Sequence, residues 1–163
     1  MSTPECYVIR HVNDEEDLKS LEVELDGALN AQTDIIIIEP ARLGKETARW
    51  ISVGNFLHKG SVVCGVTACI ASFITDRLKV LVPLGLSSFI CAGVYMISWQ
   101  FDPCCKYQVA KHIDSSVVPL HRLKVTDPVI LVRKDDKRRK ILHTVLAMLS
   151  LSICLRKLYK SRS

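Results

Sequence analysis

The sequence predicts a membrane protein: an α-helical transmembrane hairpin with a small α+β head formed from the N- and C-terminal regions. Three observations predict this fold class. Residues 60–75 and 80–101 are uncharged apolar runs, separated only by the four residues DRLK. Short strand patterns lie on both sides of these runs. A third apolar run, at residues 141–155, predicts a C-terminal amphipathic or membrane-associated helix over residues 141–158.

The two uncharged runs predict transmembrane helices over residues 59–75 and 80–101. The second run is 22 residues long, and about 20 helical residues cross a hydrocarbon core of ~30 Å. The first run is shorter and reaches spanning length when it is extended back through residues 56–58, with Lys59 extending to the membrane surface. Neither run has the polar face that a helix of a small soluble domain would show. A juxtamembrane helix over residues 46–58 is expected before them.

The head is predicted from residues 1–45 and 102–140. The segment CYVIRHV favours a strand, and DIIIIEP is a short β-branched run of the kind found in covered strands. PLHRL at residues 119–123 and PVILVRK at 128–134 are further strand candidates. Four such strands would form one sheet, covered by a helix with one apolar face at Leu18, Leu21, Leu25, Ala28 and Leu29.

The third apolar run leaves two alternatives open. Its 15 residues are few for a membrane span and typical of an interfacial helix. Basic residues flank it on both sides, so the positive-inside rule gives no direction. The sequence favours a membrane-associated helix over a third span.

Small residues recur at helical spacing on both predicted spans. They are Ser61, Gly65 and Cys69 on the first, with Ser88 and Ala92 on the second. Small residues let helices approach closely in lipid, where the hydrophobic effect does not drive helix association. The stripe therefore predicts either packing within the hairpin, which is favoured, or homo-oligomerisation.

A basic cluster, RKDDKRRK, adjoins the third run. Its cations are Arg133, Lys134, Lys137, Arg138, Arg139 and Lys140. A basic cluster beside an apolar helix attracts anionic lipid headgroups, which makes these residues a candidate headgroup site. The alternative is a solvated flank that only sets topology.

Cys104 and Cys105 follow Pro103 at the end of the second run. A zinc site needs about four ligands, and no second cysteine pair lies at metal spacing. A disulfide between neighbouring residues is strained. The pair is therefore predicted to form a packed structural corner, with acylation of juxtamembrane cysteines as an alternative.

Other chemistry finds little support in the sequence. The net charge of +5 and 6% aromatic residues disfavour nucleic-acid binding. The five histidines show no ligand pair at helical spacing. Gly44 and Lys45 follow a strand, but Glu39 and Glu46 stand where a phosphate-binding loop needs glycine and a hydroxyl. No catalytic, cofactor or metal residue is expected. The N-terminal residues carry no signal-peptide pattern, so any organelle import is expected to use internal signals.

Three blocks carry a family resemblance: IEPARLGKETARWISVGNFLHK, ISWQFDPCCKYQV and PVILVRKDDKRRKILH. Together they resemble the metazoan mitochondrial transmembrane protein 11 family, whose fly member is called Pantagruelian mitochondrion. The similarity is strongest over residues 35–59 and 97–143.

The resemblance implies a non-enzymatic, multi-pass mitochondrial membrane protein that shapes mitochondrial morphology and cristae. It implies the inner membrane and association with the mitochondrial contact site and cristae organising system. In that membrane the candidate lipid for the basic cluster is cardiolipin. An outer-membrane adaptor associated with mitophagy receptors is the alternative. No catalytic residues are assigned to the family, so none are carried over.

Overall fold

A computed structural model describes residues 5–10, 18–110 and 128–162. The chain divides into two compact units. The first, called the head here, is Met1–Ser52 with Pro103–Asp135. The second, called the bundle, is Val53–Asp102 with Asp136–Ser163. Each unit is therefore built from two segments that are distant in sequence.

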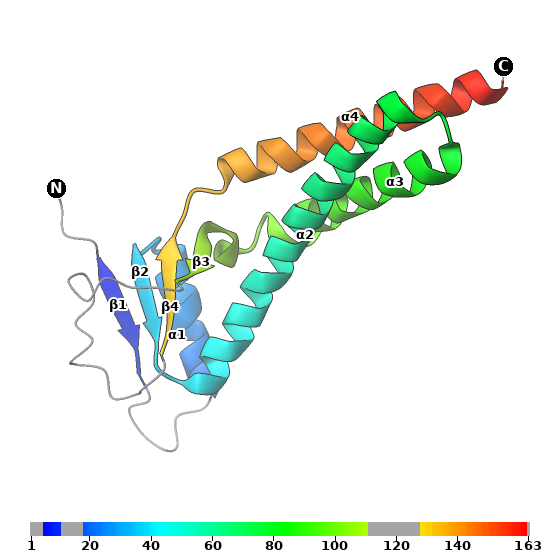
Figure 1. Cartoon of the computed structure of the whole chain (residues 1–163). Helices are drawn as coiled ribbons and strands as arrows, with labels where there is room; N and C mark the ends of the chain where they lie inside the picture. The colour runs from blue at the N-terminus through cyan, green and yellow to red at the C-terminus, as the bar shows by residue number, and fades with distance from the viewer. Residues whose placement is uncertain (1–4, 11–17, 111–127, 163) are drawn as a thin grey trace. The chain divides into compact units, whose positions relative to one another are not determined.

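The small sheet that the sequence predicts is present in the head (Figure 1). Its strands are β1 (Cys6–Ile9), β2 (Ile35–Ile38), β3 (Tyr107–Val109) and β4 (Val129–Arg133), in the order β1-β2-β4-β3. β1 and β2 are parallel, whereas β4 runs antiparallel to both β2 and β3. The predicted strand at PLHRL lies outside the described residues. β3 has only three residues, too few for an alternating pattern to predict it.

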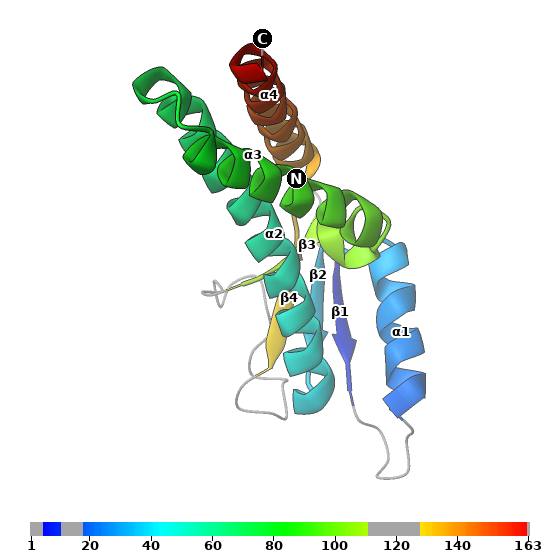
Figure 2. The same cartoon turned by 90° about the vertical axis from the view of Figure 1, so that its right-hand side faces the viewer.

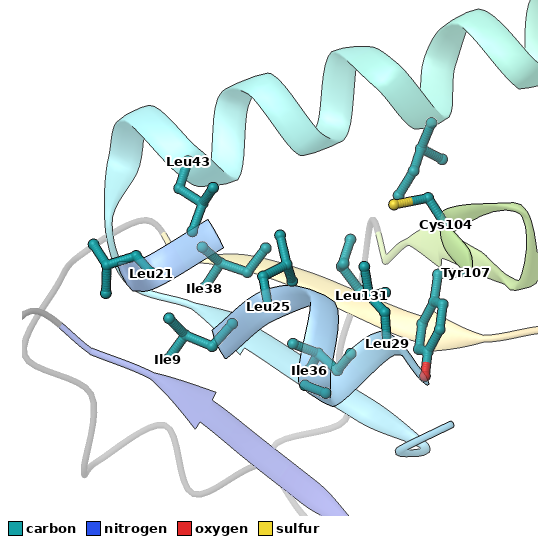
Figure 3. Close-up of a cluster of buried hydrophobic side chains, with 12 residues drawn as sticks. Ile9, Leu21, Leu25, Leu29, Ile36, Ile38, Leu43, Cys104, Tyr107 and Leu131 are labelled. Atoms are coloured by element: carbon teal, nitrogen blue, oxygen red, sulfur yellow. The ribbon is translucent and has the colours of Figure 1, made fainter. Parts of the chain in front are cut away.

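Helix α1 (Leu18–Asn30) packs its apolar face on this sheet, as its residue spacing predicts. Figure 3 shows the resulting core, in which Leu25 and Leu29 of α1 meet side chains of β2 and β4. All four isoleucines of β2 are buried: Ile36 and Ile38 belong to this core, and Ile35 and Ile37 cluster with Ile130 of β4. The core consists of Ile9, Leu21, Leu25, Ala28, Leu29, Ile36, Ile38, Leu43, Ile51, Cys104, Tyr107 and Leu131.

The turn between α1 and β2 is held by side chains from the later segment of the head. Gln32 has a positive φ of 59°, and its carbonyl and side-chain oxygens accept hydrogen bonds from Arg133 at 3.0 and 2.6 Å. The Tyr107 hydroxyl donates to the Thr33 carbonyl oxygen at 2.8 Å. Burial raises the pKa of Tyr107, so its phenol stays protonated and remains a donor. The two segments of the head are thus joined by side chains as well as by the sheet.

The bundle contains the three longest helices. α2 (Ala41–Ile74) begins in the head and runs without interruption through the predicted juxtamembrane helix and first span. α3 (Leu78–Val94) continues into a π-helical turn, Tyr95–Trp99. α4 (Lys137–Arg162) begins four residues before the predicted C-terminal helix. All three are long and apolar enough to cross a membrane by length and composition.

α4 runs parallel to α2 and antiparallel to α3 within the bundle (Figures 1 and 2). At one end His143 of α4 contacts His58 and Tyr95. Near the other end Cys154 donates a hydrogen bond to the Leu81 carbonyl oxygen at 3.2 Å, and Lys157 reaches the end of α2. α4 therefore extends along the same length of the bundle as α2 and α3.

The distribution of polar and apolar side chains in the bundle differs from that of a water-soluble protein. Several polar side chains are buried in its interior, among them Ser61, Ser88, His143 and Ser150, each 0% exposed, beside larger residues such as Leu81 and Tyr95. Large apolar side chains point outward, for example Phe73, which is 90% exposed. Lipid solvates such surfaces and water does not. The outward apolar residues include Val63, Val66, Ile70, Leu86, Phe89, Ile90, Val94, Ile141, Leu142, Val145, Met148, Leu149 and Leu155.

Four of the five residues of the predicted small-residue stripe are buried inside the bundle: Ser61, Gly65, Ser88 and Ala92. Ser61 and Ser88 each donate a hydrogen bond to the other's carbonyl oxygen, at 3.0 and 2.8 Å. Cys69 is only half-buried, and Ala68 takes the interior position beside it. The stripe therefore lies between helices of one chain.

A core substitution on β4 should weaken the head. Leu131→Ala removes a fully buried side chain and should destabilise the head by about 2–5 kcal/mol, since the cavity cannot collapse completely. Val132→Ala, one residue further and 38% exposed, is the control and should cost about 0.5 kcal/mol. Hydrogen exchange of the β2 amides, measured on the full chain in detergent micelles, compares the two. Equal loss of protection in both variants would contradict this core.

A large side chain at Gly65 should force the bundle helices apart. A Cβ atom there would lie 2.8 Å from Ser88 Oγ and 3.2 Å from Leu146 Cβ, so Gly65→Leu clashes with α3 and α4 together. Gly93→Leu is the matched control, because nothing lies within 4 Å of its added Cβ. Thermal unfolding in detergent micelles should show a clearly lower midpoint for Gly65→Leu alone. Similar midpoints for both variants would argue against this packing.

Candidate functional site

The predicted basic cluster is divided between the two units. Arg133 is the last residue of β4 in the head, and its guanidinium donates a hydrogen bond to the Gln32 carbonyl oxygen. The backbone N–H of Lys134 donates to the Lys106 carbonyl oxygen at 2.6 Å. Lys137, Arg138, Arg139 and Lys140 form the first turn of α4 in the bundle. The six residues therefore serve two different structural roles.

The first turn of α4 concentrates positive charge at a helix N-terminus. Asp136, 5% exposed, immediately precedes the helix and pairs with Lys140 Nζ at 2.7 Å. Lys137 and Arg138 point outward and are exposed. Helix N-termini carry a partial positive charge, so cations there are unfavourable unless anions lie nearby. Among the described residues, no acidic side chain lies in this first turn.

Polar side chains link α2 to α4 at and directly after this first turn, a feature that the sequence did not predict. Arg139 Nη2 donates to Asn55 Oδ1 at 2.6 Å. One helical turn further along, the Nδ1 atoms of His58 and His143 lie 3.1 Å apart. Such a bond requires a proton on one of the two nitrogens and a lone pair on the other. The Tyr95 ring packs edge-on against His143, with centroids 4.7 Å apart.

Sequence spacing could not reveal these links. His58 and His143 are 85 positions apart, and no local pattern relates them. The one available signal was that each histidine interrupts an apolar run, which is costly in lipid unless the group has a partner. Across residues 5–10, 18–110 and 128–162, no group of three or more His, Cys, Asp or Glu side chains could hold a metal ion.

The end of the bundle opposite the histidines is closed by Lys157. Its Nζ donates to the carbonyl oxygens of Ser72 and Thr75, at 2.6 and 3.1 Å. It also pairs with Asp76 Oδ1 at 2.8 Å, and this hydrogen bond holds the pKa of the Asp76 carboxyl below its usual range. A lysine at these carbonyls satisfies the last acceptors of α2 and complements its dipole.

Cys104 and Cys105 lie in a short 3₁₀ turn, Pro103–Lys106, and are buried at 8% and 3% exposure. Figure 3 shows Cys104 directed into the head core on the same side as Leu131 and Tyr107. Cys104 also lines a hollow of about 300 Å³ that includes Trp50 and Leu43. Both side chains thus pack within the head at the corner that follows α3.

Comparison with known proteins identifies the family. The profile of the mitochondrial morphogenesis regulator family matches residues 5–159. The chain is 46% identical over 166 residues to transmembrane protein 11-A, mitochondrial, of Xenopus laevis, covering 98% of this chain and 88% of that protein. It is also 46% identical to the human transmembrane protein 11, mitochondrial, covering 98% and 86%.

No solved structure matches the chain. The family assignment therefore depends on sequence similarity, which extends over the strands of the head and all three apolar helices. The chain belongs to the mitochondrial morphogenesis regulator family, together with the mitochondrial transmembrane protein 11 of vertebrates.

Proposed function

We propose that the chain is a non-enzymatic, multi-pass protein of the mitochondrial inner membrane that organises mitochondrial morphology and cristae. One observation carries the proposal: a folded head is assembled from the segments on either side of two apolar helices, α2 and α3. A protein built this way presents a folded surface on one side of a membrane. That is the property required of a membrane organiser.

The pairing of β2 with β4 constrains the membrane topology. β2 precedes α2 and β4 follows α3. Strands that exchange backbone hydrogen bonds lie on the same side of a membrane, because an open sheet cannot cross hydrocarbon. The chain must therefore cross an even number of times between them. Two crossings, by α2 and α3, satisfy this constraint and use the apolar surface of both helices.

The packing of α4 supports a third crossing. His143 and Cys154 contact opposite ends of the hairpin, and side chains between them on the other face, such as Val145 and Met148, are exposed and apolar. A helix lying flat at the membrane surface would contact only one end of the hairpin. The residues after α4 are then on the side opposite the head.

The first turn of α4 supports a role in lipid binding. Four cations lie at the positive end of a helix dipole, so nearby anions would stabilise them. Anionic headgroups, cardiolipin among them, supply such charges where the bundle enters the membrane. The head, which lies on that side, is the surface available to protein partners, and the family resemblance favours the cristae organising system as one of them.

Tags at the two ends of the chain test the topology. With three crossings, the N- and C-terminal tags lie on opposite sides of one membrane. Protease should then digest one tag in mitoplasts and the other only after detergent is added. If α4 does not cross, both tags become digestible in the same condition. Digestion of either tag in intact mitochondria would place the protein in the outer membrane and favour the adaptor function.

Complementation tests the function itself. Cells that lack the gene should have abnormal mitochondrial shape and cristae, and the wild-type chain should restore both. The double variant Lys137→Gln, Arg138→Gln should restore them less well, because each nearby cation contributes on the order of 1 kcal/mol to headgroup attraction. Lys19→Gln with Lys45→Gln removes the same charge from exposed sites on the head and should rescue fully. Electron microscopy of cristae compares them, and normal cristae without the gene would refute the proposal.

A further inference from the structure

A hollow in the head lies between α1 and the first turns of α2. Its volume is about 300 Å³, and its lining consists of Glu22, Leu25, Asp26, Leu43, Glu46, Thr47, Trp50 and Cys104. All of these residues belong to the head. Figure 3 shows Leu25 on α1, Leu43 on α2 and Cys104 on the 3₁₀ turn directed toward the same core. The hollow is therefore a feature of the folded head.

The floor of the hollow is apolar. Leu25, Leu43 and Cys104 are 6%, 3% and 8% exposed and belong to the core of the head, so core packing fixes their positions. The Thr47 hydroxyl donates its proton to the Leu43 carbonyl oxygen at 2.9 Å. Beside them, Trp50 is 43% exposed. Tryptophan is enriched among the residues that dominate protein–protein binding, because its ring supplies a large apolar contact area. This floor suits an apolar side chain.

The rim of the hollow is acidic. Glu22 and Asp26 are exposed on α1, Glu46 lies on α2, and no Lys, Arg or His side chain is part of the lining. Arg42 pairs with Glu46 at 3.3 Å, but both side chains are largely exposed, and such surface pairs are weak. Within the described part of the chain, Glu22 and Asp26 form no ion pair. The hollow therefore favours a positively charged occupant.

The spacing of the two α1 carboxylates supports the same conclusion. Glu22 and Asp26 are four residues apart on one helix, and like charges at this spacing repel and destabilise the helix. A cationic group placed between them would remove that repulsion. Binding of a cation therefore relieves an unfavourable interaction that exists in the free head.

The floor and the rim together select a protein segment as the occupant. Anionic lipid headgroups would be repelled by the carboxylates, and a bare metal ion would gain nothing from the apolar floor. The volume is at the small end of the range of about 300–1,000 Å³ that is typical of ligand pockets, which suits one or two side chains of a protruding segment. A basic amphipathic segment uses both features, because its apolar side chain contacts the floor and its cations contact the rim.

We propose that this hollow docks a basic segment of a partner protein. One apolar side chain of the segment lies against Leu25, Leu43 and Trp50, and flanking lysines or arginines pair with Glu22 and Asp26. The inference rests on the proposed role of the head as a surface for protein partners, and it specifies the chemistry of such a partner. Because the charges are exposed, added salt weakens the interaction.

Selection from a library of short random peptides tests this site without knowledge of the natural partner. The full chain is held in nanodiscs of phosphatidylcholine, a lipid without net charge, and peptides that bind empty nanodiscs are removed first. The enriched peptides should carry a large apolar residue next to lysine or arginine. Titration of a labelled copy of each enriched peptide then gives its affinity for the chain.

Two charge-matched double variants locate the binding. Glu22→Gln with Asp26→Asn removes the two rim charges of α1 and should weaken binding of the enriched peptides about fivefold, the ratio expected for the loss of two exposed ion pairs. Glu24→Gln with Asp34→Asn removes the same charges from head residues outside the hollow and should leave the affinity unchanged. Hydrogen exchange of the β2 amides verifies that both variants keep the fold.

Each other result would overturn the inference or the proposed function separately. Enrichment of peptides without cations, no enrichment at all, or equal affinity for the two double variants would overturn the docking site. A chain that restores cristae yet selects no basic peptide would refute this inference alone. Selection of basic peptides, together with normal cristae in cells that lack the gene, would refute only the morphological function.

Discussion

The pairing of β2 with β4 is the constraint on which the rest of the structure depends. Ile35–Ile38 exchange backbone hydrogen bonds with residues 129–132, more than ninety positions away, and the two apolar helices lie between them in the chain. Backbone N–H and C=O groups need hydrogen-bond partners wherever they are buried in a protein or a membrane. This pairing therefore closes the head and brings together the segment before α2 and the segment after α3.

The bundle and the head are stabilised by different interactions. The head buries large apolar residues such as Leu21 and Leu131 away from water, and that burial supplies most of its stability. In lipid the same burial offers no advantage, so the helices associate through close approach and hydrogen bonds. Gly65 beside Leu146, and the reciprocal bonds of Ser61 and Ser88, are the contacts that this environment favours.

Charged side chains interact with the helix ends of the bundle. Lys157 complements the C-terminus of α2 from within the chain. At the start of α4, Asp136 pairs with Lys140 at 2.7 Å. Arg77, which precedes α3, makes no side-chain capping bond.

The sequence by itself determined the apolar helices, the core-facing side of α1, the buried strand β2 and the family, because each depends on a local pattern or on a contiguous block of residues. Only the tertiary structure decided which segments meet. The strand β3, the His58–His143 pair and the position of α4 along α2 and α3 join residues that are distant in the chain. Their partners follow from closure of the sheet and packing of the helices, and no spacing in the sequence encodes either one.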